Sequence, residues 1–286
     1  MFFQQVINGL ATGSIYAMVA LGYTMIYGIL GLINFAQGEI YMAGAFAAVL
    51  AMSAFHVGFV PAFIIALAVS SVVGVLMERL AFRPLRNSNP LIPLIAAIGV
   101  SLSLQSLARI LFGPNNRPFP IKINYTIVHV FGAKIPVLDI VILASAGLLM
   151  VCLTVFVKRS KYGRAMVASA LDGDAARLMG INVNSMVTLT FVIGSILSGA
   201  AGVMTAVYYN ATYPTMGMLT GLKAFSAAIL GGVGSIPGAI VGGLILGVAE
   251  NLGAAYISSG LKDAIAFAIM IIVLIVRPTG IFGKGK

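Results

Sequence analysis

Repeated long apolar runs are the feature that most constrains how this chain folds. A segment of about 20 apolar residues, at about 1.5 Å rise each, crosses the hydrocarbon core of a bilayer as a helix. Of the 286 residues, 60% are hydrophobic and 8% are charged, whereas roughly a quarter of the residues in a soluble domain are charged. So few charges cannot cover a surface that faces water. The sequence therefore predicts an all-α, polytopic membrane protein whose outer surface contacts lipid.

Seven of these runs are interpreted as membrane spans, and together they form one transmembrane domain over residues 1–286. The runs are residues 6–30, 40–55, 59–77, 91–112, 136–157, 187–208 and 264–276. We expect the last to extend back toward Leu261. The Gly-rich stretch 216–256 fits the alternation of spans only if it enters and leaves from the outer side, as a helical hairpin or a re-entrant pair. The sequence thus predicts about eight spans, one of them broken or short.

Basic residues give the chain a net charge of +10, and their positions indicate its orientation. They lie between the apolar runs and form no basic face interleaved with aromatic residues, so we expect no nucleic-acid partner. Cytoplasmic loops of membrane proteins carry an excess of Lys and Arg. Alternating the spans places eleven of the 17 basic residues on one face, namely Arg79, Arg83, Arg86, Lys158, Arg159, Lys161, Arg164, Arg177, Arg277, Lys284 and Lys286. We therefore expect that face to be cytoplasmic, with the N-terminus outside and the C-terminus inside.

Two loops between the spans have a composition of their own. The outer loop, residues 113–135, is rich in β-branched residues at 123–130, which predicts a small extracellular β-hairpin. The inner loop, residues 158–186, is long, polar and free of Pro. Within it, residues 165–179 have the pattern of an amphipathic helix, which we expect to lie at the cytoplasmic surface.

Catalytic and metal-binding patterns are missing from the sequence. The two histidines, His56 and His129, fall in predicted outer loops and are interpreted as surface residues, and there is no His-Glu-x-x-His pattern. The segment from Gly280 has the spacing Gly-x-x-x-x-Gly-Lys, but a phosphate-binding loop needs a strand before it, then Ser or Thr and a helix after it. We therefore expect no enzyme activity, metal or cofactor in this chain, and we assign any ATP chemistry to another polypeptide.

Polar residues within the expected membrane depth are the first candidates for a substrate pathway. Asn34, Gln37 and Glu39 join the first two spans, and Glu250 and Asn251 lie late in the Gly-rich stretch. Ionisable groups at such depth are costly and usually face a bundle interior or a watery path. Two interpretations of Glu39 stay open. It lies either at the cytoplasmic interface, where its charge favours a helix N-terminus, or in a gate or pathway.

The Gly-rich segment 230–238 supplies a second group of candidates. Backbone that breaks a helix inside a bilayer is tolerated where protein or a water-filled cavity satisfies its polar groups, and such breaks often line transport routes. The candidate pathway residues here are Gly232, Gly234 and Ser235, with packing alone as the alternative. Gly238 and Gly242, then Gly243 and Gly247, have the four-residue spacing that lets helices approach closely. For Gly243 and Gly247 we favour packing.

The inner loop supplies the candidates for partner docking. Residues 174–180 predict a short helix with a small-residue face and a left-handed stop at Gly180. The pattern is an acidic residue followed by two Ala, three further residues and a Gly. Such a helix is either an ordinary interfacial helix or one that docks into a groove of a soluble partner and transmits a rigid-body push to the attached spans. Its length and spacing favour docking. The candidate docking residues are Arg164, Asp174, Ala175, Ala176, Arg177 and Gly180.

Three segments in order along the chain carry a family resemblance. They are residues 34–39 (Asn-Phe-Ala-Gln-Gly-Glu), residues 162–181 from Tyr-Gly-Arg-Ala to Gly-Ile, and residues 230–239 (Leu-Gly-Gly-Val-Gly-Ser-Ile-Pro-Gly-Ala). Across nearly its whole length the chain resembles the LivH-type permease subunits of bacterial branched-chain amino-acid ABC transporters. The resemblance implies an importer of the inner membrane, with a second related permease, two ATP-binding ATPase subunits and a soluble substrate-binding protein. It also implies that the inner helix is the coupling loop that contacts the ATPases.

The chain departs from this family at two places, and the substrate stays open. Many members have His where Gln37 stands, and Gln cannot gain a proton. Around Asp172-Gly173-Asp174 the family more often has Glu-Asp followed by a helix former. Because Gly costs about 1 kcal/mol of helix stability relative to Ala, we expect the docking helix to begin only after Gly173. The resemblance indicates a branched-chain or other hydrophobic amino acid as substrate. Urea or short amides, or an ion-gradient-driven secondary transporter, are the alternatives.

Overall fold

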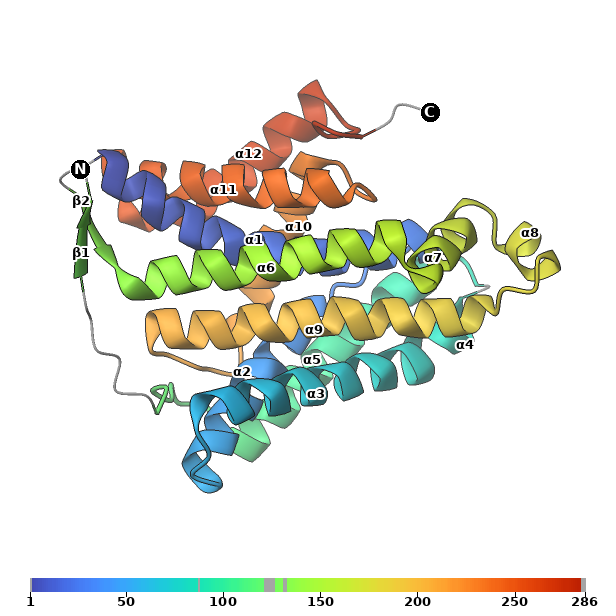
Figure 1. Cartoon of the computed structure of the whole chain (residues 1–286), viewed down its shortest axis with the longest axis horizontal. Helices are drawn as coiled ribbons and strands as arrows, with labels where there is room; N and C mark the ends of the chain where they lie inside the picture. Colours follow the sequence, from blue (N-terminus) through green and yellow to red (C-terminus); the bar gives the residue numbers. More distant parts are fainter. Residues whose placement is uncertain (1, 87, 121–126, 131–132, 284–286) are drawn as a thin grey trace.

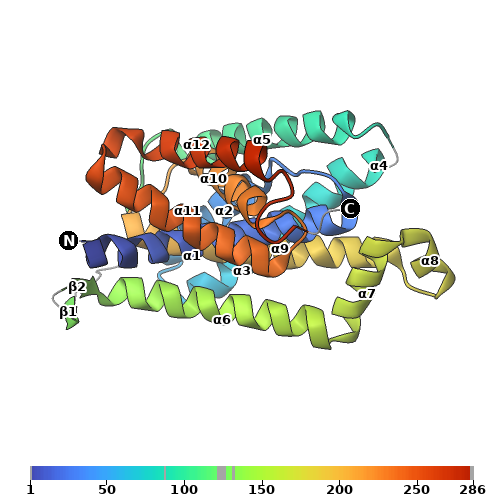
Figure 2. The ribbon, with the colours of Figure 1, turned by 90° about the horizontal axis from the view of Figure 1, so that it is seen from above.

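The computed structural model describes residues 2–86, 88–120, 127–130 and 133–283. Figure 1 shows an elongated bundle whose long helices run roughly side by side. At one end lie the N-terminus, β1 (Ile127–Val130) and β2 (Ala133–Pro136), and we call it the β-hairpin end. At the opposite end lie α7 (Lys161–Leu171) and α8 (Gly173–Leu178), and we call it the α7–α8 end. The same two ends are seen from above in Figure 2.

Helices dominate the described residues, as the sequence predicted. Besides α7 and α8 they are α1 (Phe2–Leu30), α2 (Gln37–Ala54), α3 (Phe59–Met77), α4 (Arg83–Leu85), α5 (Leu91–Phe112), α6 (Val137–Arg159), α9 (Val183–Tyr209), α10 (Met216–Gly231), α11 (Ile236–Tyr256) and α12 (Lys262–Val276). A π-helical turn, η1 (Glu78–Phe82), joins α3 to α4, and a 3₁₀ turn, η2 (Ser259–Leu261), precedes α12. In the outer loop β1 and β2 pair antiparallel; residues 121–126 and 131–132 of that loop lie outside the described residues.

Seven helices of the described chain are long and apolar enough to cross a membrane. They are α1, α3 continued through α4, α5, α6, α9, α11, and α12 with its 3₁₀ turn. The last therefore extends back past Leu261, as expected. Two further helices, α2 and α10, lie within the bundle but are not among these seven. The helix α10 is shorter, and the first turn of α2 carries the polar residues Gln37 and Glu39. The described part of the chain thus has seven spans, or nine if α2 and α10 are included, and the expected number was about eight.

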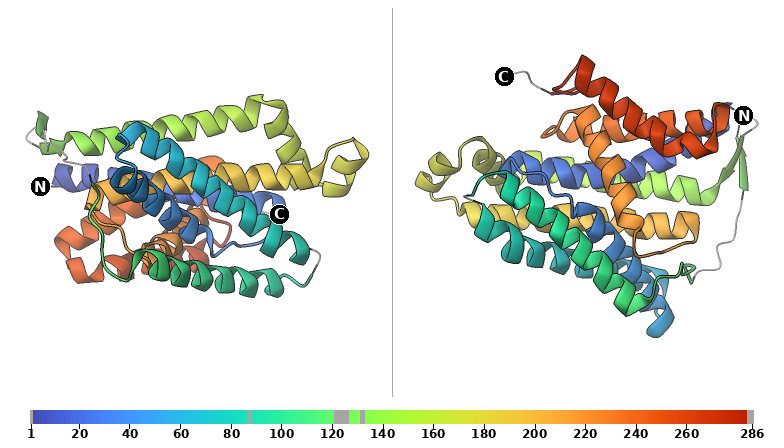
Figure 3. Two further views of the ribbon diagram at one scale, coloured as in Figure 1. Left: turned by 90° about the horizontal axis from the view of Figure 1, so that it is seen from below. Right: turned by 180° about the vertical axis from the view of Figure 1, so that it is seen from behind.

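The helices α2 and α10 begin inside the bundle rather than at its ends. After α1 reaches the α7–α8 end, residues 31–36 return toward the middle of the bundle before α2 starts (Figures 1 and 3). After α9 reaches the β-hairpin end, residues 210–215 do the same for α10. The two helices cross closely, since a Cβ on Gly38 would collide with the carbonyl of Gly217 and approach Gly221. Two helix N-termini, entering from opposite ends, thus meet in the interior.

Close glycine packing joins α1 to α11 along the centre of the bundle. A Cβ on Gly13 would meet the backbone of Gly243 and Leu244, and a Cβ on Gly243 would meet Ala17. Gly247 likewise lies against the backbone of Gly13. The expected packing role of Gly243 and Gly247 is confirmed. Because the most apolar windows of α1 and α9 are 78% and 72% buried but that of α12 is only 6% buried, α1 and α9 form the core and α12 lies on the outer surface of the bundle.

The Gly-rich stretch forms a helical hairpin of α10 and α11, one of the two forms expected for it. Its turn, residues 232–235, lies at the α7–α8 end beside α7, where Gly234 and Met166 line one cavity. The break is therefore at an end of the bundle, not in its middle. Positive φ angles of 102° at Gly232 and 91° at Gly234 explain why Gly is needed there. The backbone N–H of Ile281 donates to Leu230 O at 2.9 Å, so the C-terminal segment covers this turn.

Candidate functional site

The interior polar cluster consists of Asn34, Gln37 and Glu39 at the start of α2. All three side chains are buried. The Asn34 side-chain oxygen accepts from the backbone N–H of Ala36 at 3.1 Å, and its amide donates to Gln37 Oε1 at 3.3 Å. The amide of Gln37 donates to Ser198 Oγ at 2.7 Å, and also to a backbone carbonyl of α9. These bonds connect the re-entering segment to α9 and fix the position at which α2 begins.

Glu39 lies on the other side of α2, facing α5. Its Oε1 accepts from Ser101 Oγ at 3.0 Å and from Gln105 Nε2 at 2.8 Å. Its Oε2 has no hydrogen-bond partner among the described residues and is buried. Glu39 lies in the first turn of α2, as one of its two interpretations expected, but α2 begins inside the bundle and the side chain is only 1% exposed, so Glu39 does not lie at an exposed interface. A role in a gate or pathway stays a prediction. Ser101 and Gln105 also line a cavity of 260 Å³ between α5 and α10.

A second polar region is a tyrosine-lined cavity of 480 Å³ at the β-hairpin end of α10; the sequence indicated Glu250 beside it as a candidate but none of the residues that line it. We call it the tyrosine cavity. Its lining comprises Tyr16, Tyr41, Thr205, Tyr209, Ala211, Tyr213, Met216, Leu219, Thr220, Lys223, Lys262 and Asp263. These residues come from α1, α2, α9, the loop after α9, α10 and α12. Cavities that bind small molecules are commonly about 300–1,000 Å³ and combine apolar walls with a few polar groups, so this cavity has the size and lining of a ligand site.

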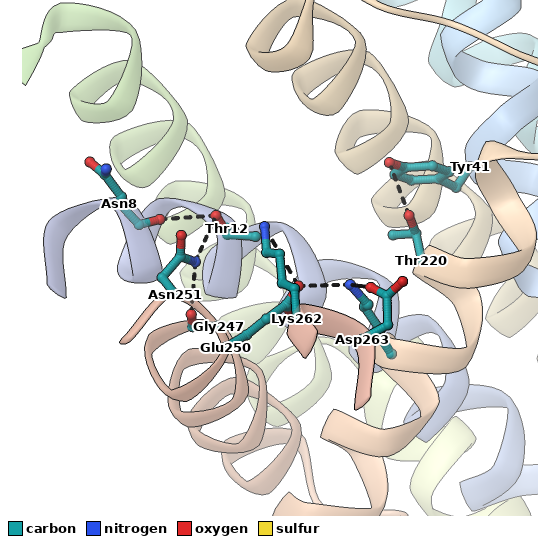
Figure 4. A network of polar contacts seen from close by, with 10 residues as sticks. Asn8, Thr12, Tyr41, Thr220, Gly247, Glu250, Asn251, Lys262 and Asp263 are labelled. Carbon is teal, nitrogen blue, oxygen red and sulfur yellow. Dashed lines mark hydrogen bonds and ion pairs between the residues drawn. The ribbon is translucent and has the colours of Figure 1, made fainter. Parts of the chain in front are cut away.

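Four charged residues from α10, α11 and the start of α12 form one network beside the tyrosine cavity (Figure 4), and three of them, Lys223, Lys262 and Asp263, line it. Lys223 Nζ lies 2.7 Å from Glu250 Oε1 and 2.5 Å from Asp263 Oδ1, and Lys262 Nζ lies 3.6 Å from the same oxygen of Glu250. Glu250 is fully buried, whereas the side chain of Asp263 is 51% exposed. Two positive and two negative charges therefore balance. The feature of the sequence that could have indicated this network is the presence of Lys223 and Glu250 on the two arms of one apolar hairpin.

The predicted docking residues lie at the α7–α8 end. One helix was expected over residues 165–179, but the structure has two, α7 and α8, separated at Asp172. The carboxylate of Asp172 accepts from the backbone N–H groups of Asp174 and Ala175, both at 2.9 Å. This cap holds the first turn of α8, so the expectation that the helix begins only after Gly173 is wrong. The predicted stop at Gly180 is confirmed by its φ of 80°.

Most of the predicted docking residues are exposed. Arg164, Asp174, Ala175, Arg177 and Gly180 face outward, whereas Ala176 is buried against the bundle. Leu178 and Met179 are 89% and 82% exposed, an unusual position for apolar side chains at a bundle end. Basic residues converge beside them. Burial and the nearby Arg177 lower the pKa of Arg86, which donates a hydrogen bond to Asn184. The structure thus presents an apolar and basic surface at this end.

The remaining predicted pathway residues, Gly232, Gly234 and Ser235, are not brought together with Asn34, Gln37 and Glu39. They form the turn at the α7–α8 end, where Ser235 Oγ accepts from the backbone N–H of Gly238 at 3.2 Å and caps α11. Their part in a pathway stays a prediction. No group of three or more His, Cys, Asp or Glu side chains that could hold a metal ion occurs within the described ranges.

The fold and these polar regions define a multi-pass helical membrane protein of the permease class. The comparisons with known proteins give its family: the chain belongs to the family described as branched-chain amino acid transport system / permease component, whose model matches residues 5–274. The high-affinity branched-chain amino acid permease protein LivH of Escherichia coli K12 is 44% identical over 295 residues, covering 99% of this chain and 96% of LivH. BraD of Pseudomonas aeruginosa has the same identity and coverage. The resemblance inferred from the three motifs is therefore confirmed.

One solved structure resembles the chain in fold. It is described as PsaBC from Streptococcus pneumoniae in complex with Fab, and it matches with a TM-score of 0.54 at 14% sequence identity. The match covers 99% of this chain and 94% of the other. At this identity the likeness concerns the arrangement of helices alone.

Proposed function

We propose that this chain is the permease subunit of an ATP-driven importer of branched-chain or other hydrophobic amino acids. The observation that carries the proposal is the 44% identity to LivH and to BraD over 99% of the chain. In this proposal the importer contains a second related permease, two ATPase subunits and a soluble substrate-binding protein. The chain itself binds no cofactor and hydrolyses nothing; ATP is bound by the partner subunits.

The α7–α8 end is the proposed site of contact with the ATPases. Support comes from the exposed Leu178 and Met179 beside basic residues, because an apolar anchor with a charged rim is typical of docking surfaces. ATP binding would close the two ATPases together and displace α8. That displacement would reorient the spans, so that the pathway opens first to the binding protein and then to the cytoplasm.

We place the α7–α8 end in the cytoplasm and the β-hairpin end outside, in the inner membrane of a bacterium. The support is that nine of the eleven basic residues of the proposed inner face lie on η1, on α4 and directly after it, at the end of α6, on α7 and α8, and directly after α12, all toward one end of the bundle; Lys284 and Lys286 lie outside the described residues. To test the topology, Arg177→Cys is introduced in a Cys152→Ser background and labelled with an impermeant thiol reagent. Labelling only from inside is expected, and labelling from outside would overturn the docking model.

Reconstitution tests the transport function directly. Proteoliposomes with the permeases, the ATPases and the binding protein should accumulate leucine when ATP is present on the ATPase side. Proteoliposomes without the ATPases should show no concentrative uptake. Uptake that needs an ion gradient and disappears with an ionophore would instead support a secondary transporter, a possibility suggested by the buried Glu39 and its unpartnered oxygen within the described structure. Urea and acetamide are tested in parallel to decide the substrate class.

A further inference from the structure

We propose that the tyrosine cavity binds the zwitterionic backbone of an amino acid, with the substrate carboxylate on Lys223 and the substrate ammonium on Asp263. The inference rests on the proposed function and specifies a binding site for it. The observation behind it is that Lys223 has two carboxylate partners. Lys223 already has a buried partner in Glu250 at 2.7 Å, so its second ion pair, with Asp263, is not needed to neutralise it.

The two partners of Lys223 differ in burial. Glu250 is fully buried on α11, and Lys262 gives it a second cation at 3.6 Å. A buried charge that loses its partner is costly, so the Lys223–Glu250 pair is a fixed part of the structure. Asp263 lies in the first turn of α12, and its side chain is 51% exposed. Water can solvate Asp263 when it leaves Lys223, and the buried Lys223 ammonium keeps Glu250 as its partner, so this ion pair opens more readily than the Lys223–Glu250 pair.

A zwitterion fits this arrangement because it can insert into the Lys223–Asp263 pair without leaving any charge alone. Its carboxylate would replace Asp263 on the Lys223 ammonium, and its own ammonium would pair with the released Asp263. Glu250 would keep both Lys223 and Lys262. The two positive and two negative charges of the cluster already balance, so a simple anion or a simple cation would leave the site with one uncompensated charge, whereas a zwitterion keeps it neutral. The charge pattern therefore favours a ligand that carries both charges on adjacent carbons.

The walls of the cavity favour an apolar side chain on that ligand. Lys223 Nζ lies 5.9 Å from the centre of the Tyr16 ring, whose face attracts the cation. Beyond the charges, Ala211, Met216 and Leu219 line the space. Tyr41 is held in place by Thr220, whose hydroxyl lies 3.5 Å from the tyrosine hydroxyl. Small hydrophobic amino acids match this combination of one charged wall and several apolar or aromatic walls.

Ligand binding to the purified full-length permease tests the assignment without transport. The ligands are L-leucine, leucinamide, which lacks the carboxylate, and 4-methylpentanoate, which lacks the ammonium. Each ligand that binds the folded protein raises its thermal midpoint by mass action, and a titration gives the affinity. We expect leucine to bind most tightly. Because a hydrogen bond to a charged group contributes about 1.5–3 kcal/mol, Asp263→Asn should weaken leucine binding about tenfold or more and leave 4-methylpentanoate unchanged or tighter.

Asp139→Asn is the control for loss of an acidic charge in the first turn of a helix, at a residue that is buried whereas Asp263 is half exposed. Asp139 is also the acidic residue in the first turn of a helix at the β-hairpin end, on α6, and it is not part of the cavity lining. The Asp139→Asn variant should leave the preference for leucine over 4-methylpentanoate unchanged. A second variant, Lys223→Gln, should weaken leucine and 4-methylpentanoate together and spare leucinamide. No leucine binding, or an unchanged preference in Asp263→Asn, would overturn the proposed site.

The binding assay and the uptake assay fail independently. Leucine uptake driven by ATP in wild-type proteoliposomes, combined with an unchanged ligand preference in Asp263→Asn, overturns the site and leaves the importer function standing. Conversely, leucine binding that depends on Asp263, with no ATP-driven uptake in the full assembly, supports the site and overturns the importer function.

Discussion

Replacing Gly13 by Ala tests the close packing of α1 on α11 with a single added methyl group. The new Cβ would lie 2.8 Å from Gly243 O, and 2.9 and 3.1 Å from Cα and O of Leu244. All three atoms belong to backbone, so they cannot rotate away as the end of a side chain can. Overpacking of this kind typically costs about 1–3 kcal/mol. We therefore expect Gly13→Ala to lower the free energy of unfolding.

Gly28→Ala is the control for this prediction. Gly28 lies on the same helix, and apart from its chain neighbours and the nearby backbone of that helix, no heavy atom of the described structure comes within 4 Å of a Cβ built on it. Both variants gain the helix propensity of Ala over Gly, about 1 kcal/mol, so this contribution cancels in their difference. The remaining difference of about 1–3 kcal/mol corresponds to thermal midpoints about 2–12 °C apart, at roughly 2–4 °C per kcal/mol.

The assay is thermal unfolding in detergent, followed by circular dichroism at one scan rate for both variants. The midpoint of Gly13→Ala should lie below that of Gly28→Ala. Gly247→Ala, which opposes Gly13 across the same contact, should also destabilise. Because the two sites share one contact, the double variant should lose less than the sum of the single effects. Equal midpoints for Gly13→Ala and Gly28→Ala would refute the packing argument and leave the glycine spacing of α11 without a structural explanation.

Three further changes address the interior polar cluster and the docking surface. Gln37→Leu removes the donor to Ser198 Oγ and the acceptor of the Asn34 amide, so the free energy of unfolding should fall by about 1–3 kcal/mol in chemical denaturation. Ser198→Ala removes one acceptor only and should cost less. Glu39→Gln keeps an acceptor for the two α5 donors and removes a buried charge, so stability should not fall, and unchanged leucine uptake would exclude its carboxylate from the pathway. Leu178→Asp changes a side chain that is 89% exposed, so the thermal midpoint should stay constant while co-purification of the ATPases decreases; undiminished co-purification would contradict docking at α8.

The sequence predicts the lipid-facing helices best because their boundaries coincide with changes in hydropathy. The helices α3 and α5 begin and end at the predicted residues, since each apolar run stops at Gly, Pro or charged residues. The start of α2 was placed at residue 40, but the helix begins at Gln37. The first turn of α2 is polar because its side chains bond to α5 and α9 in the interior. A prediction from hydropathy alone assigns such polar residues to a loop, so it places the start of the helix too late.

The candidate site depended on contacts that no local pattern contains. The polar character of Asn34, Gln37 and Glu39 indicated an unusual position, yet their partners lie on helices far along the chain. The Lys223–Glu250 pair joins residues on α10 and α11, and finding it required knowing how the two arms of the hairpin face each other. The break at Asp172 was accessible in principle, because an Asp followed by Gly and a helical run is a common N-cap signal.

The long helix α9 gives the proposed importer a physical link between its two ends. It begins at Val183, just after α8, and ends at Tyr209, which lines the tyrosine cavity. Its 27 residues span about 40 Å at 1.5 Å each, and most of the helix is buried in the core. Gln37 bonds to the middle of α9, so any displacement of α9 also acts on the start of α2. A rigid-body movement at α8 would thus reach both the interior polar cluster and the tyrosine cavity through one helix.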